Sequence, residues 1–278
     1  DFDITKDAVE VESILALDQY ALAKLHDLDA KVRAAYDQYH FSSVVQTINT
    51  YCTNDLSAVY LDILKDRLYV EKPGSLERRS AQTVLYHTLD VLTHLMAPVL
   101  SFLAEEVSDF YQHPKTQSVH LQDFPVVLDV WAHLGTRLQP ERVRTYLPET
   151  DSTIATYSVL KQGQWTMLEI VRAVVLKAIE VQREQGGVKH SYEAQVTIAV
   201  APSSREYALL QSFMAELAHH GQAAEHFLKD WFVVSRVIIA TDMVGLEQSS
   251  VPWAFVAAVH AQGVKCPRCW RWEQSTHA

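Results

Sequence analysis

Residues 18–39, DQYALAKLHDLDAKVRAAYDQY, decide the fold class of this 278-residue chain. The apolar residues of this stretch recur in alternating steps of four and three, at Ala21, Leu25, Leu28, Val32, Ala35 and Tyr39. This spacing places them on one stripe of a helix that is about six turns long. Only 8 residues of the chain are glycine, well below the usual share of about 7%, which leaves few of the tight turns that all-β folds need. The sequence therefore predicts a mainly helical protein.

The same spacing continues through the first 113 residues. Further helical patterns lie at 41–52, 56–68, 84–95 and 99–110, and a turn, EKPGS, at 71–75. Short connections between long amphipathic helices are typical of an antiparallel bundle. We assign residues 1–113 to this bundle.

The second half of the chain has a different pattern. Four prolines in residues 114–151 predict a connecting segment with at most a short helix near Trp131. A long helix is expected over 154–182, ended by a pair of glycines. A helix at 204–219 and three runs rich in strand-forming residues, at 192–200, 232–240 and 253–259, follow. This pattern therefore predicts that residues 152–262 form a smaller α+β domain with a three-stranded sheet.

Composition and charge exclude several classes of protein. The chain has 48% hydrophobic residues, 3 cysteines and 24 Lys+Arg against 34 Asp+Glu, which excludes a disordered tail, a collagen-like fibre and a disulfide-rich miniprotein. No run reaches the roughly 18 apolar residues of a membrane-spanning helix. The acidic beginning, DFDITKDAVEVE, is unlike a secretory signal. We therefore expect a cytoplasmic protein with no membrane partner.

The segment KCPRCWRW, residues 265–272, is the sharpest local motif. The thiolates of Cys266 and Cys269 can reach one tetrahedral Zn²⁺ from a single tight turn. Only Glu273 and His277 follow them as further ligands, so the zinc site is incomplete. A redox dithiol or two unliganded thiols are the alternatives, and the redox interpretation is disfavoured because a thioredoxin-like site needs a helix after its first cysteine.

The same segment carries three cations, Lys265, Arg268 and Arg271. They alternate with two tryptophans, Trp270 and Trp272. This composition suits single-stranded RNA, because cations hold phosphates while indole rings stack on unpaired bases. The alternative is that the tryptophans simply cover the small turn.

Four more cations lie in the predicted bundle: Lys65, Arg67, Arg78 and Arg79. The simplest interpretation is a solvated helix face with surface ion pairs. The bundle is acidic overall, so any contact with nucleic acid there must use a local patch. The sequence contains no P-loop, no GxGxxG and no HExxH motif, and it predicts no complete active site.

Four stretches of this sequence, in order, resemble bacterial-type isoleucyl-tRNA synthetase. The run NDLSAVYLDILKDRLYVEKPGSLERRSAQTVLYHTLDVLTHLMAPVLSFLAEEV, residues 54–107, resembles its anticodon-binding helical domain. SVHLQDFP, residues 118–125, is similar to the exit from that domain, and VRAVVLKAIEVQREQGGVKHSYEAQVTI, residues 171–198, to the C-terminal junction region. VKCPRCWRW, residues 264–272, resembles the first half of its zinc-binding peptide. The resemblance covers nearly the whole chain.

The resemblance implies binding of the anticodon stem and loop of isoleucine tRNA, with upstream catalytic and editing domains as partners in the same enzyme. It implies Cys266 and Cys269 as zinc ligands, and Arg268 and Trp270 as residues that touch the anticodon loop. It also suggests four residues as phosphate contacts: Lys65, Arg67, Arg78 and Arg79.

The resemblance has limits. The HIGH and KMSKS signatures of class I synthetases are absent, so ATP and magnesium are expected only in the parent catalytic domain and this chain is not expected to activate isoleucine alone. The second CxxC of the zinc peptide is absent too.

The expected organisation is therefore a class I synthetase anticodon-binding bundle (1–113), a connecting segment (114–151), an α+β junction domain (152–262) and a truncated zinc-binding peptide (263–278). Two rival functions stay open. One is a stand-alone helical protein-interaction module with a metal knuckle, and the other is a CxxC oxidoreductase.

Overall fold

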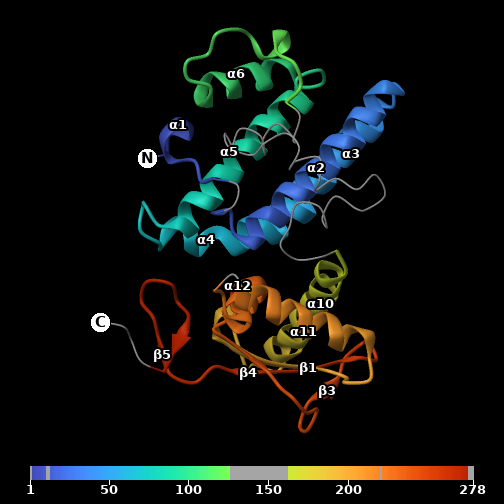
Figure 1. Cartoon of the computed structure of the whole chain (residues 1–278), viewed down its shortest axis with the longest axis vertical. Helices are drawn as coiled ribbons and strands as arrows, with labels where there is room; N and C mark the ends of the chain where they lie inside the picture. The colour runs from blue at the N-terminus through green and yellow to red at the C-terminus, as the bar shows by residue number, and fades with distance from the viewer. Residues whose placement is uncertain (1, 11–12, 126–161, 220, 275–278) are drawn as a thin grey trace. The chain divides into compact units, whose positions relative to one another are not determined.

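The computed structural model describes residues 2–10, 13–125, 162–219 and 221–274 (Figure 1). The chain divides into two compact units, residues 1–159 and 160–278. Each unit is described by itself. In the described residues no helix is both long and apolar enough to cross a membrane.

The first unit is helical. Its elements are α1 (Ile4–Asp7), α2 (Ala16–Asp37), α3 (Phe41–Thr50), the π-helix η2 (Tyr51–Leu61), α4 (Asp62–Tyr69), α5 (Leu76–Met96), α6 (Ser101–Tyr111) and the 3₁₀-helix η3 (Val119–Leu121). The long helix α2 packs on both α3 and α5. Leu25, Leu28 and Val32 of the predicted stripe are buried in this core. Tyr39 is not, because α2 ends at Asp37 and Tyr39, with φ 57°, is 79% exposed.

The two helices expected at 41–52 and 56–68 are one continuous helical rod, α3–η2–α4. Tyr51 and Tyr60 are both buried and are nine positions apart, which is two and a half turns of an α-helix and would put them on opposite faces. The wider turns of a π-helix close on the fifth residue, so two of them span about nine residues. The π segment thus keeps both tyrosines facing the core.

The predicted turn and the helix after it are confirmed. The Ser75 side chain accepts a hydrogen bond from the backbone N–H of Arg78, so it caps α5. After α6, residues 112–125 pack back on the bundle, where the backbone N–H of Val119 donates to Glu105 and Arg33 donates to the carbonyl of Pro125. The remainder of the predicted connecting segment, with Trp131, lies outside the described residues.

The second unit is a sheet covered by helices. Its elements are α10 (Gln162–Glu184), the 3₁₀-helix η4 (Ser191–Glu193), β1 (Ala194–Val200), α11 (Arg205–His219), α12 (Ala224–Phe232), β2 (Arg236–Ile239), β3 (Glu247–Gln248), β4 (Ala254–His260), β5 (Val264–Lys265) and β6 (Trp272–Glu273). The four-stranded sheet has the order β2-β1-β4-β3. Strands β1 and β2 are parallel, so they need the crossover that α11 and α12 supply.

Aromatic side chains fill the core of this unit. Trp165, Phe213, Phe227 and Trp231 contact one another between α10, α11 and α12. The indole N–H of Trp231 donates to the carbonyl of Leu168 at 3.1 Å, so its polar atom is satisfied inside the core. Gly186, with φ 74°, follows the end of α10, as the glycine pair predicted.

Two details of the expected sheet are wrong. In the described part of the chain the sheet has four strands, because the two-residue strand β3 pairs with β4. The strand expected at 232–240 begins at Arg236, because Trp231 and Phe232 are the buried last residues of α12. The mainly helical fold class with a smaller α+β region is confirmed.

Candidate nucleic-acid interface

The CPRC motif lies at the tip of a hairpin, which we call the knuckle (residues 264–273). Strands β5 and β6 pair Val264 with Glu273 and Lys265 with Trp272. The turn between them is closed by hydrogen bonds from the backbone N–H of Cys266 to the carbonyl of Arg271 and from that of Trp270 to the carbonyl of Cys266. A strand, β6, follows the turn, so the described knuckle lacks the helix that a thioredoxin-like dithiol uses.

A glycine precedes the knuckle for a steric reason. Gly263 has φ 121°, and a Cβ atom built there would lie 2.1 Å from the carbonyl oxygen of Glu273. Only glycine allows the two chain segments to approach so closely.

The two thiols of the knuckle have different environments. Backbone N–H groups of Cys269 and Arg268 donate to the Cys266 sulfur and lower the pKa of that thiol. Burial raises the pKa of the Cys269 thiol. Sulfur donors of this kind suit Zn²⁺, but the described residues contain no group of three or more His, Cys, Asp or Glu side chains that could hold a metal. The pair therefore fits half of a tetrahedral site.

One face of the knuckle is exposed and carries an aromatic ring beside cations. Trp270 is 61% exposed, and its backbone has φ 64°, which is rare for a large side chain. The Lys265 ammonium lies 5.7 Å from the centroid of the Trp270 ring. Arg268 is exposed in the same turn. An accessible indole beside cations is able to stack on an unpaired base while the cations hold phosphates.

The opposite face anchors the knuckle on the rest of the second unit. Arg271 is 6% exposed, and its guanidinium lies 2.7 Å from a carboxylate oxygen of Asp230. The backbone N–H of Trp272 donates to the Ser235 hydroxyl at 2.6 Å. Within CWRW, the Trp270 side chain is therefore exposed, whereas the Arg271 side chain and the Trp272 backbone anchor the hairpin. Asp230 and Ser235 could not be identified from the sequence, because they lie 41 and 37 positions away from their partners.

Among the four bundle cations, Arg67 has a buried partner. Asp18 is fully buried, and its carboxylate accepts hydrogen bonds from Arg67, Tyr60 and Ser80, at 3.2, 2.7 and 2.5 Å. Burial raises the pKa of Asp18, and these three donors oppose the increase. The Arg67 side chain, only 13% exposed, thus ties α4 to α2, and Ser80 joins α5 to the same carboxylate.

The other three bundle cations have partners that are nearer to the surface than Asp18. Lys65 lies 2.9 Å from Asp62, and Arg79 lies 3.3 Å from Asp7. Arg78 donates to the carbonyl of Glu71 at 3.3 Å. Their use as phosphate contacts stays a prediction. They belong to the first unit, whereas the knuckle belongs to the second.

Comparison with known proteins shows the class to which the chain belongs. Residues 18–198 match the family described as the anticodon-binding domain of tRNA ligase. The chain therefore belongs to this family of anticodon-binding domains.

The particular relatives are named isoleucine–tRNA ligase. Those from Persephonella marina and Syntrophotalea carbinolica are 36% and 35% identical over 99% of this chain and 26% of their own length. The one from Carboxydothermus hydrogenoformans is 38% identical over 97% of this chain and 25% of its length. The resemblance to isoleucyl-tRNA synthetase is thus confirmed along nearly the whole chain. The chain spans about a quarter of the length of these curated relatives.

Proposed function

We propose that this chain binds the anticodon stem and loop of an isoleucine tRNA. The family match to anticodon-binding domains and the isoleucine–tRNA ligase relatives support this proposal. The observation that carries it is the exposed face of the knuckle, where Trp270 is held in a left-handed backbone conformation beside Lys265. A left-handed backbone conformation is costly for a large side chain, and strain of this kind is common at binding sites.

The knuckle supplies two kinds of contact. The Trp270 ring stacks on an unpaired base of the loop, while Lys265 and Arg268 hold the neighbouring phosphates. Arg271, through Asp230, fixes the hairpin on the second unit, so less conformational entropy is lost when RNA binds. In the first unit, Lys65 and Arg78 are the better-placed phosphate contacts, because Arg67 is engaged by buried Asp18.

In a longer protein of the kind its relatives represent, this part would position the tRNA and other domains would do the chemistry. We propose that such a protein joins isoleucine to its tRNA with ATP and magnesium. Docking of the anticodon end would then help to place the acceptor end in the catalytic domain. The chemical step belongs to residues outside this chain, since the HIGH and KMSKS signatures are absent from it.

We also propose that Cys266 and Cys269 form one half of a zinc site. The lowered pKa of Cys266 and the closed turn support thiolate ligation. Titration with Co²⁺, a spectroscopic substitute for Zn²⁺, should give thiolate-to-metal absorption bands that Cys266→Ser and Cys269→Ser each remove and that Cys52→Ser leaves unchanged. Bands that survive both knuckle substitutions would contradict the proposal.

The tRNA-binding proposal is tested by fluorescence anisotropy with isoleucine tRNA and an anticodon-substituted tRNA. The chain should bind the first more tightly, and Trp270→Ala should weaken binding by roughly tenfold or more, because base–aromatic stacking contributes about 1–3 kcal/mol per base. Trp270→Phe should recover part of the affinity. Phe102→Ala, at a 93% exposed aromatic residue of α6, is the matched control and should change nothing.

The two tRNAs also separate this proposal from the rival functions. Equal affinity for both tRNAs, or insensitivity to Trp270→Ala, would contradict anticodon reading by the knuckle. A complete lack of tRNA binding would favour the protein-interaction module with a metal knuckle. Disulfide turnover that depends on Cys269 would favour the oxidoreductase.

A further inference from the structure

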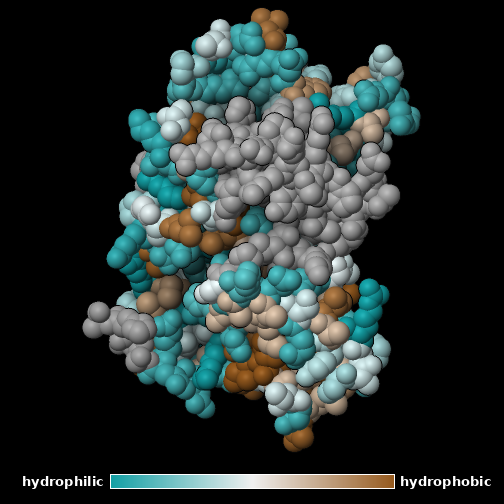
Figure 2. All heavy atoms as spheres, in the orientation of Figure 1, coloured by the Kyte–Doolittle hydropathy of each residue, from teal (hydrophilic) through white to brown (hydrophobic). Residues whose placement is uncertain are grey.

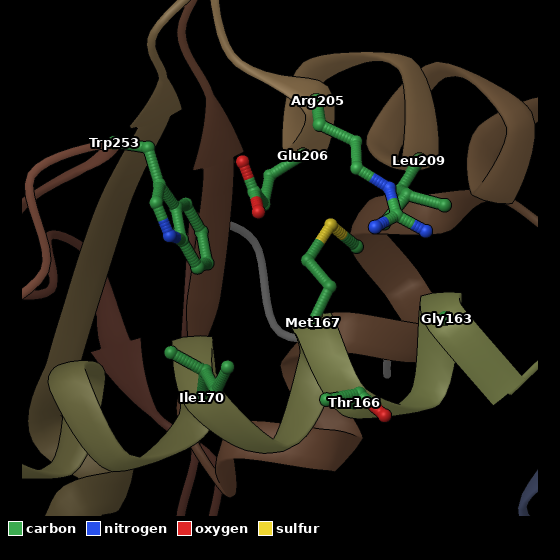
Figure 3. A pocket seen from close by; sticks show the side chains of 8 residues that line it. All are labelled: Gly163, Thr166, Met167, Ile170, Arg205, Glu206, Leu209 and Trp253. Carbon is green, nitrogen blue, oxygen red and sulfur yellow. The ribbon is translucent and has the colours of Figure 1, made fainter.

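The α+β unit also contains a pocket of about 350 Å³, which is separate from the knuckle. Helix α10, the first two turns of α11 and the residue before β4 line it (Figure 3). Its volume falls within the roughly 300–1,000 Å³ of small-molecule sites. No sequence motif indicates this pocket, because its lining residues come from three separate segments of the chain.

The pocket combines an apolar lining with two charged groups. Met167, Ile170, Leu209 and Trp253 provide the apolar surface. Figure 3 shows the Trp253 ring as one wall, with the Glu206 carboxylate on the Trp253 side and the Arg205 guanidinium on the Gly163 side. Among the described residues, no ion pair joins Arg205 or Glu206 to another side chain. Two charges of opposite sign beside an aromatic wall are therefore available to a ligand.

We infer that this pocket binds one unpaired nucleotide, with guanine as the preferred base. The base stacks on the flat face of Trp253, because every base has a π face that an indole ring can cover. The Arg205 guanidinium pairs with the phosphate, as forked guanidinium groups do. Arg205 also begins α11, and the N-terminus of a 15-residue helix adds favourable partial charge for an anion. The choice of an RNA constituent as ligand rests on the proposed function.

The base preference follows from Glu206. A carboxylate only accepts hydrogen bonds. The Watson–Crick edge of guanine has two adjacent donors, N1–H and N2–H, which match the two carboxylate oxygens. Uracil has one donor between two carbonyl oxygens, and cytosine and adenine have an amino donor beside a ring-nitrogen acceptor. These acceptors repel the carboxylate, so guanine fits it best.

The experiment is an NMR titration of the whole chain with mononucleotides, observed at the indole N–H resonances. Guanosine monophosphate should shift the Trp253 resonance, which Trp253→Phe assigns, and it should bind about tenfold or more tightly than uridine monophosphate, because one bidentate pair is worth about 1–3 kcal/mol. Glu206→Gln should remove this base preference. Arg205→Met should remove the advantage of guanosine monophosphate over guanosine.

Arg236→Met is the matched control, because Arg236 is exposed on β2 and does not line the pocket. The indole resonances of the other tryptophans report whether each variant is folded. No shift of the Trp253 resonance by guanosine monophosphate, or an unchanged preference in Glu206→Gln, would overturn the inference. If tRNA binding still depends on Trp270 while mononucleotides fail, only the pocket is refuted. If mononucleotides bind but tRNA does not, only the proposed function is refuted.

Discussion

At the scale of single residues, two arginines that look equivalent in the sequence have opposite environments. Arg268 is exposed at the tip of the knuckle, whereas Arg67 lies beside the fully buried Asp18. No local pattern distinguishes them, because Asp18 is 49 positions from Arg67 along the chain. The sequence of the bundle therefore suggests four cations as phosphate contacts, but it does not show which of them is a buried ion-pair partner.

This difference predicts unequal effects on stability. Arg67→Met leaves the Asp18 carboxylate buried without its cation and should lower the free energy of unfolding by about 3–5 kcal/mol. Lys65→Met removes an exposed ion pair with Asp62 and should cost at most about 1 kcal/mol. Urea unfolding followed by circular dichroism measures both. Equal, small effects of the two substitutions would show that Arg67 is not the structural partner of Asp18.

At the scale of elements, the helices were predictable where the apolar spacing is regular and not where it breaks. The helix expected at 18–39 differs from α2 by two residues at each end. The π-helix η2 was not predictable, because the spacing between Tyr51 and Tyr60 looks like a break between two α-helices. Helix α12 was missed because its buried aromatic residues, Trp231 and Phe232, continue into the β-rich run that follows.

The hydrogen bonds between α6 and the segment after it predict that the stability of the chain depends on pH. Lys115, Ser118 and the backbone N–H of Val119 donate to the Glu105 carboxylate and lower its pKa from 4.5 to about 2. They join α6 to the segment that follows it. Because the native state favours the ionised form, this contribution to stability is present above pH 4.5 and is lost as the pH falls toward about 2.

Glu105→Gln should therefore be less stable than the parent chain at neutral pH, and the gap in urea midpoint should close as the pH falls through this window. Glu106→Gln is the control, because the neighbouring Glu106 is exposed. Its urea midpoint should follow that of the parent chain at every pH. A gap for Glu105→Gln that stays constant down to pH 2.5 would mean that the charge of Glu105 does not hold this segment.

At the scale of the whole molecule, acidity is the property that RNA binding must overcome. The chain has a formal net charge of -10, and Figure 2 shows hydrophilic side chains over most of the visible face of the described residues, with apolar ones in separate patches. Long-range attraction of a polyanion is therefore weak, and binding has to come from local groups of cations. The knuckle motif indicated one such group from sequence alone. Its split into an exposed and an anchored face needed the structure, because the anchors Asp230 and Ser235 are distant in sequence.

This argument predicts how salt affects tRNA binding. The logarithm of the binding constant should fall linearly with the logarithm of salt concentration, with a slope of about -0.7 for each single-stranded phosphate that a cation neutralises. Arg268→Met should make the slope shallower by about that amount, whereas Trp270→Phe should lower the affinity and leave the slope unchanged, because stacking releases no counterions. Anisotropy titrations at several salt concentrations measure both quantities. If Arg268→Met weakens binding without changing the slope, Arg268 does not contact a phosphate, and its role in the knuckle is to hold the turn that presents Trp270.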